Sequence, residues 1–360
     1  MSITDVYAAL SKQLNEQLPF VAYTKADSSI LQVVLQCDDT KHILDEYTAS
    51  GFIFAPFDTS KETIFIPSHR SETLHVDLGV YTEVETNLPP SFKMISDTTK
   101  DKLRHMQLVE KGIETITSST IEKIVLSRTE EIVHADTFDA LVLFKRLISS
   151  YPSAFVYFWY HPKVGTWLGA TPETLLQSKN DKVATMSLAG TQPYESNKPI
   201  HWGSKEIEEQ ELVTRHILKT LHPVLHTITS SKTYTYRAGS LLHLRTDITG
   251  DIAAEANLSE IIKILHPTPA VCGLPTKEAQ TFIQQHEGYD RKFYTGFLGE
   301  LNKNENGETA SNLFVNLRCM ELKKNRAILY VGGGITKDSI PEKEWKETVK
   351  KTETMKKVLF

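Results

Sequence analysis

The sequence predicts an α+β protein built mainly from antiparallel strands. Strand-like segments outnumber helical patterns along the 360 residues, and they come in groups instead of alternating strictly with helices. Strict alternation would have favoured a doubly wound parallel sheet. No internal repeat, low-complexity tract or linker rich in Pro, Gly or Ser divides the chain. We therefore expect one compact domain over residues 1–360, with an N-terminal subdomain over 1–105 and a core over 106–360.

Each expected element rests on a local pattern. In the first hundred residues, runs rich in β-branched and aromatic residues are separated by polar, turn-forming clusters. These runs read SILQVVLQC, SGFIFAPF and ETIFIPS, and a second group reads AFVYFWYHP, TWLGAT, ETLLQS and KVATMSLAG. Apolar residues at helical spacing predict the helices. The predicted helices cover residues 97–117, 137–149, 204–221, 257–265, 276–286 and 341–359.

Composition and charge exclude several classes of protein. The net charge of −5 argues against a nucleic-acid partner, because phosphate binding requires clustered Lys and Arg. The opening stretch MSITDVYAALSKQL lacks the features of a signal peptide, and no run approaches ~18 apolar residues. We expect a cytoplasmic protein with no membrane segment. Cys37, Cys272 and Cys319 are widely scattered, so we expect small core residues, not disulfide partners or zinc ligands.

The stretch EKIVLSR places a lysine within an apolar run that reads as a buried strand. Strand alternation puts Ile121, Lys123 and Val125 on one face, and the other face is also apolar. Enclosure would disfavour the ammonium form and lower the pKa of Lys123 toward the range in which a neutral amine accepts a proton. The commoner alternative is a lysine at the strand's edge whose amine reaches water. The spacing by itself leaves both alternatives open.

The helix predicted over 341–359 carries acidic residues away from its solvated face. At about 100° per residue, one arc is plainly solvated, and it holds Glu342, Lys343, Lys346, Lys350, Glu353 and Lys357. Glu344, Glu347 and Lys351 instead share the other side with apolar residues. An exposed Glu347–Lys351 ion pair, worth only ~0.3–0.5 kcal/mol, would explain the pair but not the side on which it lies.

A second helix repeats this feature. In SKEIEEQELVTRHILKTL, Glu209 lies on the same stripe as Val213 and Ile217. Carboxylates that face a core are usually neutralised, paired or bound to a hard cation such as Mg²⁺. Because Glu209 and Glu347 both point inward from helices, a metal site is a reasonable hypothesis, although spacing alone does not bring them together.

Two glycine-bearing stretches, SLAGTQP and YVGGGITKDS, each follow a strand-like run. Their small residues would let backbone N–H groups approach a carboxylate closely. The second stretch lacks the GxxxxGK[ST] spacing of a phosphate loop, so it does not indicate an NTPase.

The unusual stretches also form an ordered set. They are EKIVLSR, GATPE, SLAGT, EEQELV, LLHL, LHPTPAVCGLP, YDRKFYTGFLGE, NLRC, GGGI and EWKET. This order resembles the chorismate-utilising enzymes, and within that family the isochorismate synthases. The resemblance implies a single α+β domain in which two large antiparallel sheets pack together with helices outside. It also implies Mg²⁺-dependent addition of water at C2 of chorismate, with departure of the C4 hydroxyl.

Two residues match the family's catalytic pair. Lys123 matches the general base that takes the proton from the attacking water, and Glu173, in GATPE, matches the general acid that protonates the leaving hydroxyl. Taken alone, Glu173 would be interpreted as an exposed acid at the end of a strand. The resemblance implies that the two residues hold opposite protonation states.

Other positions match the family's metal and substrate contacts. Glu209 and Glu347 match the Mg²⁺ ligands, and Glu344 matches a neighbouring acid that can act through a metal-bound water. Arg318, in NLRC, and Lys351 match groups that meet substrate carboxylates. The remaining matched positions line the substrate pocket, and they are Gly190, Thr191, His243, Ala270, Tyr294, Tyr330, Gly332 and Gly333.

The resemblance also bears on the choice within the family. Relatives that use ammonia generally lack the lysine found here at 123, and aminodeoxychorismate synthases carry a lysine where this chain has Ala189. Both positions favour water as the nucleophile, and we expect no glutaminase partner. Salicylate synthases, which add pyruvate elimination, and a non-catalytic chorismate-binding protein remain alternatives, although HPTPAVCGLP favours isochorismate synthase. The resemblance implies a monomer, and it does not distinguish menaquinone from siderophore biosynthesis.

Overall fold

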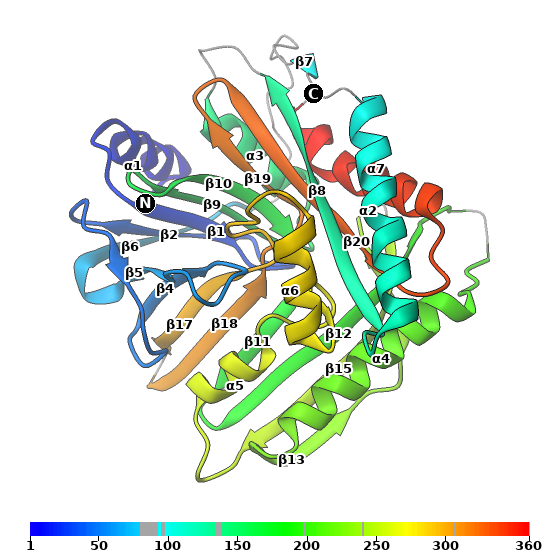
Figure 1. Ribbon diagram of the computed structural model, residues 1–360. Coiled ribbons are helices and arrows are strands. Elements are labelled where there is room, and N and C mark those ends of the chain that lie inside the picture. The colour runs from blue at the N-terminus through cyan, green and yellow to red at the C-terminus, as the bar shows by residue number, and fades with distance from the viewer. Residues whose placement is uncertain are drawn as a thin grey trace.

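Two large β-sheets packed against each other form the body of the protein. The structure, a computed structural model, describes residues 1–79, 93–94, 98–133, 139–196, 199–239, 241–305 and 307–359. Helices lie on the outer faces of the sheets (Figure 1). Every described pair of neighbouring strands is antiparallel. The predicted α+β class, with two packed antiparallel sheets, is confirmed.

Sheet one runs in the order β16-β8-β20-β19-β10-β9-β1-β2-β6, and β7 also pairs with β8. Its strands are β1 (Phe20–Thr24), β2 (Ile30–Gln36), β6 (Ser71–Asp77), β7 (Lys93–Met94), β8 (Lys123–Val133), β9 (Phe155–His161), β10 (Gly165–Thr171), β16 (Gly273–Leu274), β19 (Cys319–Lys323) and β20 (Arg326–Ile335). The helices packed on this side are α1 (Ile3–Asn15), α2 (Thr98–Ser118), α3 (Ala140–Ser150) and α7 (Pro341–Leu359).

Sheet two runs in the order β13-β15-β12-β11-β18-β17-β4-β5-β3, and β14 also pairs with β15. Its strands are β3 (His42–Ile43), β4 (Gly51–Ala55), β5 (Ile64–Pro67), β11 (Thr174–Lys179), β12 (Lys182–Pro193), β13 (Leu225–Ser230), β14 (Tyr234–Ala238), β15 (Leu241–Ile252), β17 (Phe297–Glu305) and β18 (Glu308–Val315). Helices α4 (Ser204–Leu221) and α5 (Leu258–Leu265) pack on it, α6 (Thr276–His286) packs on β8 and β16, and a short 3-10 helix covers Ser68–Arg70.

The N-terminal strands belong to both sheets. β1, β2 and β6 extend sheet one, whereas β3, β4 and β5 extend sheet two. The first eighty residues are therefore tied to the rest of the chain by backbone hydrogen bonds on two sides. The predicted division near residue 105 stays a prediction.

Aromatic side chains fill the space between the sheets. Phe54 stacks on Phe293 with ring centroids 4.2 Å apart, and both belong to a cluster drawn from the inner faces. At one end of this cluster, Trp167 stacks on Tyr330 at 5.2 Å. Stacked aromatic pairs contribute stability beyond the area that they bury. The aromatic core therefore fixes the position of β20 from within.

Most predicted helices are confirmed within one or two residues, but two expectations need correction. The helix α1 was not predicted, although Ser2 and Asp5 form a capping box at its start that is visible in the sequence. Cys272 and Cys319 are buried as predicted, whereas Cys37 is exposed because it lies just beyond the end of β2. The first residues of the helix predicted over 137–149 lie outside the described residues. No helix among the described residues combines the length and apolarity needed to cross a bilayer.

Candidate active site

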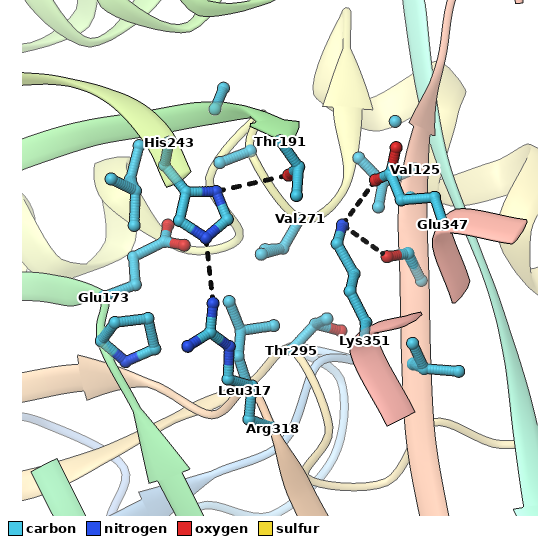
Figure 2. Close-up of a pocket in the computed structure, with 18 of the residues that line it drawn as sticks. Val125, Glu173, Thr191, His243, Val271, Thr295, Leu317, Arg318, Glu347 and Lys351 are labelled. Carbon is cyan, nitrogen blue, oxygen red and sulfur yellow. Dashed lines mark hydrogen bonds and ion pairs between the residues drawn. The ribbon is translucent and has the colours of Figure 1, made fainter. Parts of the chain in front are cut away.

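A pocket lies where the two sheets meet near α4 and α7. Sheet one contributes residues of β8 and β20, and sheet two contributes residues of β12 and β15. The predicted residues that line this pocket are Glu173, Gly190, Thr191, Glu209, His243, Ala270, Tyr294, Arg318, Tyr330, Gly332, Gly333, Glu347 and Lys351. Figure 2 shows Glu173, His243 and Arg318 on one side of the opening and Lys351 with Glu347 on the other. The fold thus brings together residues that are up to 178 positions apart (Glu173 to Lys351).

Lys123 opens β8 and has no exposed surface. Its Nζ lies 2.9 Å from Oε1 of Glu209, which projects from α4 into the pocket. The strand has neighbours on both sides, so the lysine is enclosed and does not reach water at an edge. A Cβ at Gly334 would lie 2.3 Å from Glu209 Oε1 and 2.9 Å from Lys123 Cε. Only glycine at this position lets the lysine and the carboxylate meet over β20.

Three carboxylates from α4 and α7 meet over the glycines of β20, and each is bound by a lysine. Besides the Lys123–Glu209 pair, Lys205 lies 2.5 Å from Glu344, and Lys351 lies 2.7 Å from Glu347. A Cβ placed on Gly333 would lie 3.3 Å from Glu347 Oε1 and 3.8 Å from Glu344 Oε2, so both carboxylates lie close to this glycine. Within the described residues, no three His, Cys, Asp or Glu side chains are already arranged as a metal cluster. The carboxylates are near one another, but lysines hold them.

Lys205 was not identified from the sequence. It stands four residues before Glu209 on α4, so the two side chains share a face of the helix. That spacing was a usable signal, but its partner Glu344 lies 139 residues further along the chain. Glu344 is buried, and its second oxygen has no hydrogen-bond partner among the described residues. Burial therefore raises the pKa of Glu344, the nearby Lys205 opposes that rise, and Glu347 adds to it.

The charges around Glu209 lower the pKa of its carboxyl, whereas the pKa of Glu344 is raised. Burial is the largest single influence and acts to raise the pKa of this carboxyl, and the charge of Lys123 acts against it. Lys205 and Lys351 act in the same direction, and the pKa of Glu209 falls below its usual value. Glu209 is therefore ionised at neutral pH.

Glu173 follows Pro172 in the turn between β10 and β11. Its backbone N–H is bound by Thr171 Oγ1, and its carbonyl accepts from Val315, so both sheets position the residue. The side chain is buried, and burial raises the pKa of Glu173 to about 7 against the opposing charges of Lys123, Lys351 and Arg318. A carboxyl with this pKa can carry a proton at neutral pH and release it.

His243 and Arg318 form one unit on the same side of the pocket (Figure 2). Arg318 Nη2 donates to His243 Nε2 at 2.9 Å, which leaves the proton on Nδ1 to be donated to the Gly190 carbonyl at 3.0 Å. Burial, with the charges of Arg318 and Lys351, lowers the pKa of His243 to about 3, so the ring is neutral. Among the described residues, Arg318 forms no ion pair with a carboxylate. Its guanidinium is suited to receive an anionic ligand.

The remaining predicted positions shape the walls. Tyr294 stacks on Tyr330 with centroids 5.5 Å apart, and Tyr330 donates to Glu321 at 3.1 Å. Gly190 has φ of +71°, a conformation that favours glycine, at the end of β12 that faces α4. Ala270 lines the pocket from the segment after α5.

A buried ion pair supports the pocket from behind, and sequence reasoning missed its role. Arg291 lies in the recognised stretch YDRKFYTGFLGE, four residues after its partner Glu287, and both are almost fully buried. The guanidinium also donates to the carbonyl of Val125 at 2.7 Å and of Val271 at 3.0 Å, and to Thr295 Oγ1 at 3.2 Å. All three acceptors belong to residues that line the pocket. One side chain therefore fixes three separate segments of the wall.

The comparisons with known proteins agree with this geometry. The family described as "Chorismate binding enzyme" matches residues 59–360. Isochorismate synthase EntC of Escherichia coli (strain K12) is 32% identical over 260 residues, covering 69% of this chain and 65% of that protein, slightly less than two thirds of its length. A solved structure of a putative 2,3-dihydroxybenzoate-specific isochorismate synthase, DhbC from Bacillus anthracis, has a TM-score of 0.78 and 25% identity over 97% of this chain and 99% of that one. The menaquinone-specific isochorismate synthase MenF from Escherichia coli has a TM-score of 0.77 and 22% identity over 95% and 89% of the two chains, which shows the same fold.

The raised pKa of Glu173 predicts a pH-dependent cost to stability. The folded state holds the proton to about pH 7, whereas the unfolded state releases it near its ordinary value, so stability falls as pH rises between these values. Compared with Glu173→Gln, wild type should lose roughly 3 kcal/mol of unfolding free energy between pH 4 and 8. Urea unfolding of both proteins across this range measures the difference. If the unfolding free energies of the two proteins changed in parallel with pH, the raised pKa of Glu173 would be contradicted. Glu353→Gln, on the exposed face of α7, is the control variant.

Replacing Arg291 by lysine should loosen the pocket wall. Lysine keeps the charge beside Glu287 but cannot donate to three segments from one planar group. We expect Arg291→Lys to lose about 2–4 kcal/mol of unfolding free energy. Arg326→Lys is the matched control, because Arg326 pairs with Glu131 on the surface and should lose under ~1 kcal/mol. Equal losses in the two variants would show that Arg291 has no special role.

Proposed function

This chain belongs to the chorismate-binding enzyme family, and on that premise we propose that it is an isochorismate synthase. The proposed reaction adds water at C2 of chorismate and expels the C4 hydroxyl, which makes the enzyme an isomerase. The observation that carries the proposal is a pocket lined by Glu173, a buried carboxyl whose pKa is about 7, and by Glu209, whose Oε1 lies 2.9 Å from the enclosed Lys123. Similarity to proteins named isochorismate synthase supports it.

The two catalytic groups divide the proton transfers between them. Lys123 takes a proton from the water that attacks the ring. Glu173 is protonated near neutral pH and gives its proton to the departing hydroxyl. Protonation matters because hydroxide is a poor leaving group, whereas water leaves readily. The chain thus supplies a base and an acid in different environments at one site.

Substrate carboxylates have cationic partners in the pocket. Arg318 offers a planar fork of donors with no competing carboxylate in the described chain, and its contact with neutral His243 fixes the fork's orientation. Lys351 lies on the opposite side, where it also donates to the Gly332 carbonyl at 3.0 Å. Two cationic groups on opposite sides suit the two carboxylates of chorismate, while Tyr294 and Tyr330 line the wall.

We propose that the residues around the β20 glycines hold Mg²⁺. The donor set fits, because Glu209, Glu344 and Glu347 supply oxygen atoms over the Gly333–Gly334 backbone, and Glu344 Oε2 has no other partner in the described residues. Glu209 and Glu347 would bind the ion directly, and Glu344 through water. When bound, the ion would neutralise a substrate carboxylate and orient the ring. Lys123 and Lys351 would share these carboxylates with the ion.

Within the family, the pocket favours water over ammonia. Ala189 lines the pocket at the position where aminodeoxychorismate synthases are expected to carry a lysine, and Lys123 is present and enclosed. We accordingly propose a cytoplasmic enzyme that acts as a monomer without a glutaminase partner, in menaquinone or siderophore biosynthesis. A salicylate synthase would share the first step, so product identity decides between the two.

The direct test is to identify the product. Incubation of the purified protein with chorismate and Mg²⁺ should give isochorismate, with no further product when ammonium is added. EDTA should abolish turnover, and excess Mg²⁺ should restore it. Chromatography with mass detection measures the products. Salicylate with pyruvate would assign the second activity, an aminated product would contradict the proposed base, and absence of any product would favour a binding protein.

Replacing Lys123 tests the base separately from binding. Lys123→Ala should lower kcat by at least ~10²-fold, because the attacking water loses its proton acceptor. Chorismate binding, measured by isothermal titration calorimetry, should persist within a few-fold, since Arg318 and Lys351 remain. Lys123→Met, which keeps the buried volume, guards against loss of folding. Turnover that persists in both variants would show that another group is the base.

A further inference from the structure

A second groove opens beside the pocket along α7. It is lined on one side by Lys343, Lys346, Glu347, Lys350 and Lys351, and on the other by Thr191, Gln192, Pro193 and Leu241. Thr191, Glu347 and Lys351 also line the pocket, so the groove and the pocket share part of their walls. The sequence alone predicts a plain solvated arc for Lys343, Lys346 and Lys350. The structure shows that these three lysines line the groove, and they are called the rim lysines below.

The three rim lysines are largely free to act as cations. All three are exposed, and within the described residues Lys343 and Lys350 form no ion pair. Lys346 lies 3.7 Å from Glu342, but Lys102 binds the same carboxylate more closely, at 2.9 Å. The groove is therefore positive in a protein whose net charge is −5. Clustered lysines repel one another, so grouping them is unfavourable for stability. Their grouping at the mouth of the pocket therefore indicates a role in attracting an anion.

The facing wall is irregular in a way that suits a ligand. The pairing of β12 with β15 shifts register between Ala189 and Gln192, and such a shift bends a strand and turns its side chains. Gln192 Nε2 is buried and has no hydrogen-bond partner among the described residues. Because Gln192 lines the groove, the groove wall contains a polar group without a hydrogen-bond partner among the described residues.

We infer that this groove is the path by which the dianionic substrate reaches the pocket, and that Lys343, Lys346 and Lys350 form an encounter site for its carboxylates. The inference rests on the proposed function for the identity of the dicarboxylate. The lysines attract the anion from solution, and Lys351, at the junction of groove and pocket, receives it next. This arrangement accelerates association of an anion with an acidic protein, and the acceleration weakens as salt screens the field.

The test replaces the three lysines by glutamine, which keeps helix propensity and removes the charges. Association of chorismate is followed by stopped-flow tryptophan fluorescence, to which Trp167 contributes because it stacks on Tyr330 in the pocket wall. Turnover is measured in parallel, and both are followed from low to high salt at fixed Mg²⁺. In the triple variant we expect association and kcat/KM to fall about three- to ten-fold at low salt and to converge with wild type at high salt. We expect kcat to remain unchanged.

Lys357→Gln is the matched control, since Lys357 is exposed on the same arc of α7 but lies outside the groove. It is two turns beyond Lys350, roughly 10 Å along the axis, which exceeds the Debye length of about 8 Å at physiological salt, so this control is compared with wild type at that salt. Its association rate should match wild type. Equal salt dependence of wild type and the triple variant, or an equal loss in the control, would overturn the inference.

The binding measurement separates this inference from the proposed function. If wild type binds chorismate without forming isochorismate, the proposed reaction fails, but the association rates still test the groove. If turnover is confirmed while the triple variant associates at the wild-type rate at every salt concentration, only the groove is wrong. Absence of any chorismate binding by wild type would overturn both.

Discussion

A lysine side chain with no exposed surface is stabilised by an anion beside it, and this constraint organises the site. Desolvation of an unpaired ammonium group costs several kcal/mol, so Lys123 requires Glu209 at 2.9 Å. Meeting that requirement brings α4 against the end of β20, where a side chain larger than that of Gly334 would separate the two groups. The position of one helix, one strand and one glycine thus follows from a single buried charge pair.

Four carboxyl groups share this region, and burial raises the pKa of two of them, Glu173 and Glu344. Glu209, Glu344 and Glu347 are each bound by a lysine at 2.5 to 2.9 Å. Glu173 has no such direct lysine contact among the described ion pairs, and burial therefore dominates and raises its pKa to about 7. The difference arises from position, not from residue type. It separates groups suited to binding a cation from one suited to carrying a proton.

Rigidity at the pocket and positive charge at its mouth come from separate parts of the fold. The Arg291–Glu287 pair holds the walls from behind, and the aromatic core reaches the pocket through Tyr294 and Tyr330. The rim lysines of α7 stand in solvent, where long-range attraction costs little desolvation. Buried ion pairs thus position groups, whereas exposed cations act on ligands at a distance.

The sequence by itself determined the fold class, most helix bounds, the family, and the residues that gather at the pocket. Helical periodicity was sufficient to identify Glu209 and Glu347 as candidate site residues. One segment of sequence is enough to show that an acid lies on the apolar side of its helix. Only the tertiary structure decided that Lys123 is enclosed, that Lys205 pairs with Glu344 across 139 residues, and that Arg291 joins three wall segments. It also decided that the solvated arc of α7 borders the pocket. Spacing fixes which face a side chain occupies, but what that face meets depends on how sheets and helices pack, and that is a property of the whole chain.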